Sequence, residues 1–145
     1  MKRHLVTWLC ALSVLLGCGG ASSTKFSRQV YAEASVDVRN RVVTEVLQDR
    51  PAVVLLYARG LCCPSCAIGI RKTVSRLSFV DRNQPNDGVE LDPKHQLVEI
   101  SVKEGQSAVA SQLWQAIMDA GYDPVSVFRM GVNGLETENY KGPLP

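Results

Sequence analysis

Three cysteines close together are the residues of this chain best suited to chemistry. Cys62, Cys63 and Cys66 lie within five residues, in the stretch 60–66 that reads Gly-Leu-Cys-Cys-Pro-Ser-Cys. Cys63 and Cys66 have the C-x-x-C spacing, which lets two sulfur atoms converge on one point. That point can be a soft metal ion such as Cu(I), Ag(I) or Hg(II), or it can be a disulfide. Zinc fits less well, because its structural sites take four ligands.

The role of Cys62 stays open on sequence alone. Side chains of adjacent residues point apart in an extended chain, so Cys62 is expected to face away from the pair unless the loop turns it inward. Turned inward, it would be a third ligand and would change a two-coordinate site into a trigonal one. We expect one-to-one metal binding to need only Cys63 and Cys66.

The apolar pattern around the thiols predicts an α+β domain. Period-two or continuous apolar runs predict strands, and a spacing of three to four residues predicts helices. The expected elements are a strand at 52–58, a helix from Pro64 to about 77, strands at 89–91 and 97–102, a helix at 109–120 and a strand at 125–130. This order is that of a ferredoxin-like βαββαβ sandwich, with two helices on one face of a four-stranded antiparallel sheet.

The segments flanking this domain have weaker patterns. Val38, Val42 and Val46 recur at helical spacing and Pro51 follows them, so residues 35–50 are predicted as an N-terminal extension that is helical. Residues 131–145 carry several glycines and prolines and are predicted to form a loose tail.

In the βαββαβ order, the first strand-helix loop, the hairpin turn and the last helix-strand loop share one end of the sheet. The cysteine loop, His95 and Tyr122 are therefore expected at the same end. Tyr122 is expected to pack beside the thiols and screen them. His95 could approach a metal from the turn, although a histidine in a turn is more often a solvated side chain.

Two separated blocks carry a family resemblance. Gly60, Leu61 and the cysteines match a block G-M-x-C-x-x-C, and residues 116–122 (Ala-Ile-Met-Asp-Ala-Gly-Tyr) match a later block A-I-x-x-A-G-Y. Residues 51–130 thus resemble a heavy-metal-associated domain, as in copper chaperones and mercury-binding proteins. The chain departs from the pattern with Leu61 for the usual Met, with Cys62 at a position usually Thr or Ser, and with a longer segment at 81–88.

The resemblance implies a binding protein rather than an enzyme. It implies that Cys63 and Cys66 hold the metal, with Gly60, Leu61 and Tyr122 around them. Cu(I) is the first expectation and Hg(II) or Ag(I) the next, in trafficking or detoxification by thiolate exchange with a protein partner. The cations Arg71, Lys72 and Arg76 lie off the apolar stripe of the first domain helix. They either dock an acidic partner or form an ordinary solvated face.

Other functions remain open. A strand running into Cys-Pro-Ser-Cys and a helix also suits a thioredoxin-like thiol-disulfide oxidoreductase using Cys63 and Cys66. That fold would need a further sheet and a cis-proline facing the thiols, with Pro124 as the best-placed candidate. The two cysteines could also form an inert disulfide, or the domain could serve protein contacts only.

The start of the chain resembles a bacterial lipoprotein signal peptide. Residues 1–17 have a positive start and an apolar run that is too short to span a bilayer. Residues 15–18 then read Leu-Leu-Gly-Cys. The resemblance implies cleavage before Cys18 and a lipid on its thiol, with residues 18–34 as anchor and flexible tether. Gly19, rather than Asp, favours export to the outer membrane, facing the periplasm.

The charge balance argues against a nucleic-acid partner. The chain has 16 basic and 14 acidic residues, and loss of Lys2 and Arg3 with the signal would leave 14 of each. Nucleic-acid binding usually shows a basic excess. The remaining length suits one domain with a tether.

Overall fold

The structure is a computed structural model that describes residues 30–142. It is α+β, as predicted, with three helices and a five-stranded antiparallel sheet. The helices are α1 (Val36–Asp49), α2 (Cys66–Val74) and α3 (Ala110–Asp119), with a 3₁₀ turn η1 at Pro85–Gly88. The strands are β1 (Val53–Arg59), β2 (Val89–Asp92), β3 (Leu97–Ser101), β4 (Asp123–Gly131) and β5 (Gly134–Asn139).

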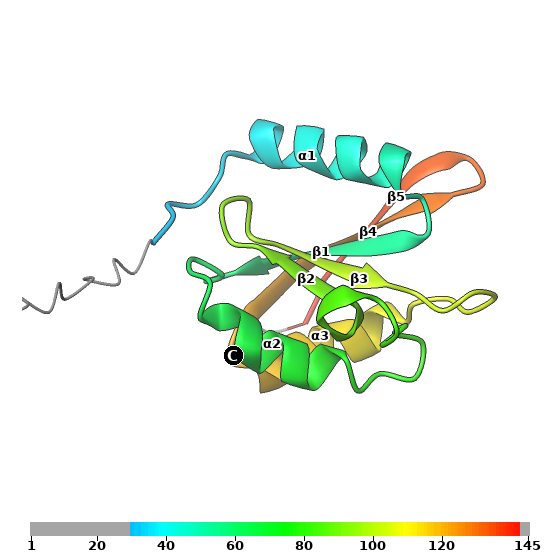
Figure 1. Ribbon diagram of the computed structural model, residues 1–145. Helices are drawn as coiled ribbons and strands as arrows, with labels where there is room; N and C mark the ends of the chain where they lie inside the picture. Colours follow the sequence, from blue (N-terminus) through cyan, green and yellow to red (C-terminus); the bar gives the residue numbers. More distant parts are fainter. Residues whose placement is uncertain (1–29, 143–145) are drawn as a thin grey trace, which may run out of the picture.

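The sheet has the strand order β2-β3-β1-β4-β5, with β1 in the centre. Helices α2 and α3 cover one face and α1 lies over the other (Figure 1). This arrangement is compatible with a ferredoxin-like plan. The predicted sheet had four strands, so the observed strand count and order differ from that prediction.

The difference lies in the predicted loose tail at 131–145, where that prediction is wrong. Residues Gly134–Asn139 form β5, which pairs with β4 from Gly131↔Gly134 to Ser126↔Asn139. Arg129 on β4 contacts two β5 carboxylates, those of Glu136 and Glu138, each at 3.1 Å. Since β5 buries none of its side chains fully, it lacks the apolar alternation by which a strand is recognised in a sequence.

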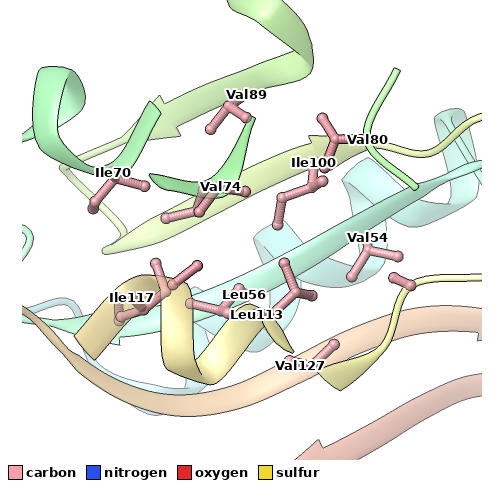
Figure 2. Packing of buried hydrophobic residues seen from close by; sticks show 14 of the residues in the cluster. Val54, Leu56, Ile70, Val74, Val80, Val89, Ile100, Leu113, Ile117 and Val127 are labelled. Carbon is pink, nitrogen blue, oxygen red and sulfur yellow. The ribbon is translucent and has the colours of Figure 1, made fainter. Parts of the chain in front are cut away.

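A large apolar core fills the space between the sheet and helices α2 and α3. Figure 2 shows its packing, to which Leu56 of β1, Ile70 of α2 and Ile117 of α3 all contribute fully buried side chains. Leu61, Cys63 and Cys66 belong to this same core. The cysteine loop is therefore packed into the domain at its base, which fixes the loop backbone.

Helix α1 confirms the helical prediction for the N-terminal extension at 35–50. The Ser35 side chain accepts a hydrogen bond from the Val38 N–H, which caps the first turn, and Pro51 follows the last one. Val43 and Leu47 are fully buried against the outer face of the sheet, in a second cluster with Leu55. Both faces of the sheet are thus covered, which lets β1 be apolar along its length.

The predicted tether at 18–34 is wrong in its described part. Residues 30–34 lie on the domain, held by hydrogen bonds to the β2–β3 turn and the cysteine loop. The predicted signal peptide at 1–17 and the lipid site at Cys18 lie outside the described residues. Among residues 30–142, no helix has the length and apolar character needed to cross a membrane.

Candidate metal centre

The cysteine loop begins where β1 leaves the sheet. The pairing of β1 with β4 shifts register between Tyr57 and Ala58, and Gly60 follows with φ of +87°. Glycine adopts such a positive φ without the steric cost that a side chain brings. The turn at Gly60 directs Leu61 into the core, where it is fully buried. The next residues are then held at the end of the domain.

The three sulfurs of this loop are close together. The Sγ atoms of Cys63 and Cys66 are 3.2 Å apart, and both residues are free thiols. The Sγ atoms of Cys62, Cys63 and Cys66 all lie within 4.8 Å of one another. The expectation that Cys62 faces away is therefore wrong, because the loop is not extended here and turns this side chain inward. Within residues 30–142 they are the only group of three or more His, Cys, Asp or Glu residues whose ligand atoms lie close enough to hold a metal ion together.

The environment of Cys63 favours its thiolate. The Ser65 hydroxyl lies 3.0 Å from the Cys63 sulfur, and that contact, followed by the one with Cys66, lowers the pKa of Cys63 to about 7. A thiolate is the form of cysteine that binds metals and attacks electrophiles. Burial, and then the neighbouring sulfurs, raise the pKa of Cys62. The two adjacent cysteines thus differ in character.

Helix α2 starts at the second cysteine of the pair. Cys66 is its first residue, and the Cys66 N–H donates to the Cys63 carbonyl at 3.1 Å. Pro64, predicted to begin the helix, lies in the turn just before it. The positive end of a helix dipole at this point favours negative charge on the sulfurs.

The site lies at the boundary between core and solvent. Cys63 and Cys66 are each 8% exposed, whereas Pro64 and Ser65 between them are exposed. Ile68, in the first turn of α2, is 74% exposed. A ligand or a partner's thiol can therefore reach the sulfurs from one side while the core supports them from the other.

Tyr122 lies beside the thiols, in the place predicted for it. It follows Gly121, whose φ of +85° ends the α3 segment, and its ring is the nearest group to Gly60 across the loop. Burial, and then a hydrogen bond with Cys66, raise the pKa of the Tyr122 hydroxyl. The Tyr122 ring thus lies against the start of the cysteine loop.

The structure does not bring His95 into the thiol cluster. Its Nδ1 atom lies 2.5 Å from a carboxylate oxygen of Asp92, within the same turn. The turn itself is at the expected end of the sheet, since the Gln96 carbonyl accepts from the Ala58 N–H at 3.1 Å. His95 is thus engaged locally and is not one of the residues grouped around the sulfurs.

The three cations singled out in α2 and after it have different surroundings. Arg71 Nε donates to the Val89 carbonyl of β2 at 3.3 Å, so this side chain is partly used in packing the helix on the sheet. Lys72 and Arg76 are exposed. Trp114 of α3 packs edge-on against Tyr140, with ring centroids 5.4 Å apart.

Sequence reasoning missed the contact between the N-terminal segment and the loop. The Tyr31 N–H donates to the Cys62 carbonyl at 2.9 Å. A backbone hydrogen bond between residues 31 positions apart leaves no signal in residue type. The sequence predicts a flexible tether for this segment and gives no indication that it approaches the thiols.

The three sulfurs could in principle hold a metal ion. A bond of about 2.3 Å, as between zinc and thiolate, places two sulfurs about 4.6 Å apart in a linear site and about 4.0 Å apart in a trigonal one. The Cys63 and Cys66 sulfurs are 3.2 Å apart, so they would have to separate by about 1 Å to hold such an ion. Comparisons with protein-family models, with curated proteins and with solved structures found no match for this chain.

Proposed function

We propose that this chain is a non-enzymatic binding protein for a soft heavy-metal ion, with Cu(I) as the first candidate and Ag(I) or Hg(II) as further cargo. Cys63 and Cys66 are the primary ligands and Cys62 is a third sulfur within reach. The observation that carries the proposal is the convergence of three free thiols within 4.8 Å. Three thiolates are a donor set that soft ions prefer.

The fold and the family resemblance support this assignment. A βαββαβ core with the cysteine loop after its first strand and Tyr122 after its second domain helix is what a heavy-metal-associated domain would have. In the proposed plan, β1, α2, β2, β3, α3 and β4 form that core. Helix α1 and strand β5 are additions to it.

The exposure of the loop supports a carrier rather than a permanent structural site. Pro64 and Ser65 face solvent between the two ligands, so an incoming thiolate can attack a bound ion and exchange with one sulfur at a time. A protein partner of acidic surface would meet the exposed Lys72, in the last turn of α2, and Arg76, just beyond that helix. Arg71 contributes less to such docking because it also bonds to β2.

The proposed cellular setting is the cell envelope. The lipoprotein-like start of the chain supports export, cleavage before Cys18 and a lipid anchor there. The protein would then act at the outer membrane, facing the periplasm, in metal trafficking or detoxification. The balanced charge supports no role with nucleic acid.

One observation favours a second candidate, a thiol-disulfide oxidoreductase. The Cys63 and Cys66 sulfurs are 3.2 Å apart, and the pKa of Cys63 is lowered to about 7, as suits an attacking thiol. Against it, residues 30–142 form a single antiparallel sheet, without the further sheet that we expected such an enzyme to need.

Two parallel assays on the reduced full-length protein separate these functions. A soft-metal binding protein takes up one equivalent of Cu(I) and shows no dithiol-driven reduction of insulin above background. Insulin reduction with repeated turnover, together with weak Cu(I) binding, would favour the oxidoreductase. Neither activity would favour a domain that serves protein contacts only.

A further inference from the structure

Residues 30–35, here called the strap, cross the end of the sheet next to the cysteine loop before α1 begins (Figure 1). The strap has no regular secondary structure, yet it is bonded at several points along its length. Its first anchor is the Tyr31 N–H, which donates to the Cys62 carbonyl at 2.9 Å.

Gln96 is the second anchor of the strap. This side chain is 3% exposed, an unusual burial for a glutamine, and its backbone has a φ of +57°. Its Oε1 accepts from the Ala34 N–H at 2.8 Å, and its Nε2 donates to the Ala32 carbonyl at 3.3 Å and to the Pro93 carbonyl at 2.9 Å. Gln96 thus ties the strap to the β2–β3 turn.

Arg39 of α1 is the third anchor. It is 4% exposed, and its guanidinium lies 3.5 Å from the centre of the Tyr57 ring. It donates to the Ala34 carbonyl at 2.8 Å and to the His95 carbonyl at 3.1 Å. Glu33 of the strap completes the cluster by contacts with Arg39 and with the Tyr57 hydroxyl. The buried Arg39 guanidinium, bonded in this way, fixes one conformation of the segment that it holds.

The bond from the strap to Cys62 acts on the geometry of the sulfurs. A hydrogen bond to the Cys62 carbonyl restrains the peptide plane between Cys62 and Cys63. The orientation of that plane is set by ψ of Cys62 and φ of Cys63, which also direct the two side chains. Release of this bond would free Cys62, which is only partly buried, to turn away from the other sulfurs.

We propose that the strap is part of the metal site: Arg39 and Gln96 are positioning residues that, through the Tyr31 N–H, keep the Cys62 thiol beside Cys63 and Cys66. This gives the protein a three-sulfur site. A bound ion then exchanges more slowly than it would from Cys63 and Cys66 alone. The claim about the bound ion rests on the proposed function. The claim that the strap positions Cys62 is independent of it.

A pair of variants at one position tests the proposal. Tyr31→Pro removes the N–H that donates to Cys62, whereas Tyr31→Ala removes the side chain and keeps that N–H. Gln96→Leu removes the second anchor, and because it breaks several bonds at once its folding is checked by circular dichroism. The sulfur number around Cu(I) is measured by X-ray absorption on the reduced full-length protein. The rate at which Cys62 is alkylated is measured by mass spectrometry without metal.

The expected result is three sulfurs around Cu(I) in the parent and in Tyr31→Ala, and two in Tyr31→Pro and Gln96→Leu. Cys62 alkylation should rise about five- to tenfold in the latter two, the effect of one hydrogen bond. Three sulfurs and an unchanged alkylation rate in Tyr31→Pro would overturn the proposal. Two sulfurs in the parent would overturn it and leave the metal function standing. If Cu(I) does not bind at all, the metal function fails, and the alkylation rates alone decide whether the strap positions Cys62.

Discussion

Graded substitution of the three cysteines tests how the sulfurs share a metal ion. The Cys63 and Cys66 sulfurs are 3.2 Å apart, so they must separate by about 1 Å to hold an ion between them. Cys62 lies within 4.8 Å of both and can replace one of them in a two-sulfur site. A single substitution therefore leaves two sulfurs, whereas a double substitution leaves one.

The expected losses follow from the number of sulfurs that remain and from whether the C-x-x-C pair is kept. Joining two ligands on one chain raises affinity by about 10² to 10⁴ over a single ligand. Cys62→Ser keeps the primary pair, so its Cu(I) affinity should stay within about tenfold of the parent. Cys63→Ser and Cys66→Ser should each lose about 10²-fold, since Cys62 compensates in part. The double variant Cys63→Ser with Cys66→Ser should lose about 10⁴-fold.

The assay is competition for Cu(I) against a coloured chelator under reducing conditions, with each variant's thermal unfolding as a control for the fold. The unfolding temperatures of Cys63→Ser and Cys66→Ser should fall, because both side chains belong to the buried core, but each variant should remain folded at the temperature of the assay. The reasoning is refuted if Cys62→Ser costs as much affinity as Cys63→Ser, or if the double variant binds like the parent.

Three further changes give independent outcomes. Ser65→Ala removes the hydroxyl that stabilises the Cys63 thiolate, so the pKa of Cys63 should rise from about 7. The pH at which Cys63 alkylation reaches half its maximal rate should then move upward. An unchanged pH profile would contradict this role of Ser65. Gly60→Ala places a side chain at φ of +87° and should lower the free energy of unfolding by about 1–2 kcal/mol and weaken Cu(I) binding. Gly105→Ala, at φ of +74° and remote from the thiols, is the matched control that should lose stability but not affinity. Cys18→Ser should abolish partition of the protein into detergent; partition and mass like those of the parent would rule out the lipid anchor.

The sequence pattern predicted the elements that have an apolar signature. Strand β1 and helices α2 and α3 are where their apolar spacing placed them, because each buries a face in the common core. The position of Tyr122 beside the thiols followed from the order of the elements alone. Strand β5 was missed because it is held by backbone pairing and by ion pairs of Arg129, and neither depends on apolar residues.

The parts of the site that escaped prediction depend on loop geometry and on buried polar groups. The inward turn of Cys62 depends on backbone angles between Gly60 and Cys63, which adjacent residue types do not specify. Arg39 and Gln96 are residue types that usually lie at the surface, so their burial under the strap could not be expected from their identity. Both features concern Cys62, one of the positions at which the chain departs from the pattern that it resembles.

The most direct test of the central claim is the stoichiometry and affinity of Cu(I) binding by the reduced full-length protein, measured by competition with a Cu(I) chelator. The account predicts one equivalent of Cu(I) per chain, bound tightly enough to be withdrawn from the chelator, with Zn(II) unable to displace it. It predicts that prior alkylation of Cys63 and Cys66 abolishes this uptake. Equal binding before and after alkylation, or no withdrawal of Cu(I) from the chelator, would contradict it.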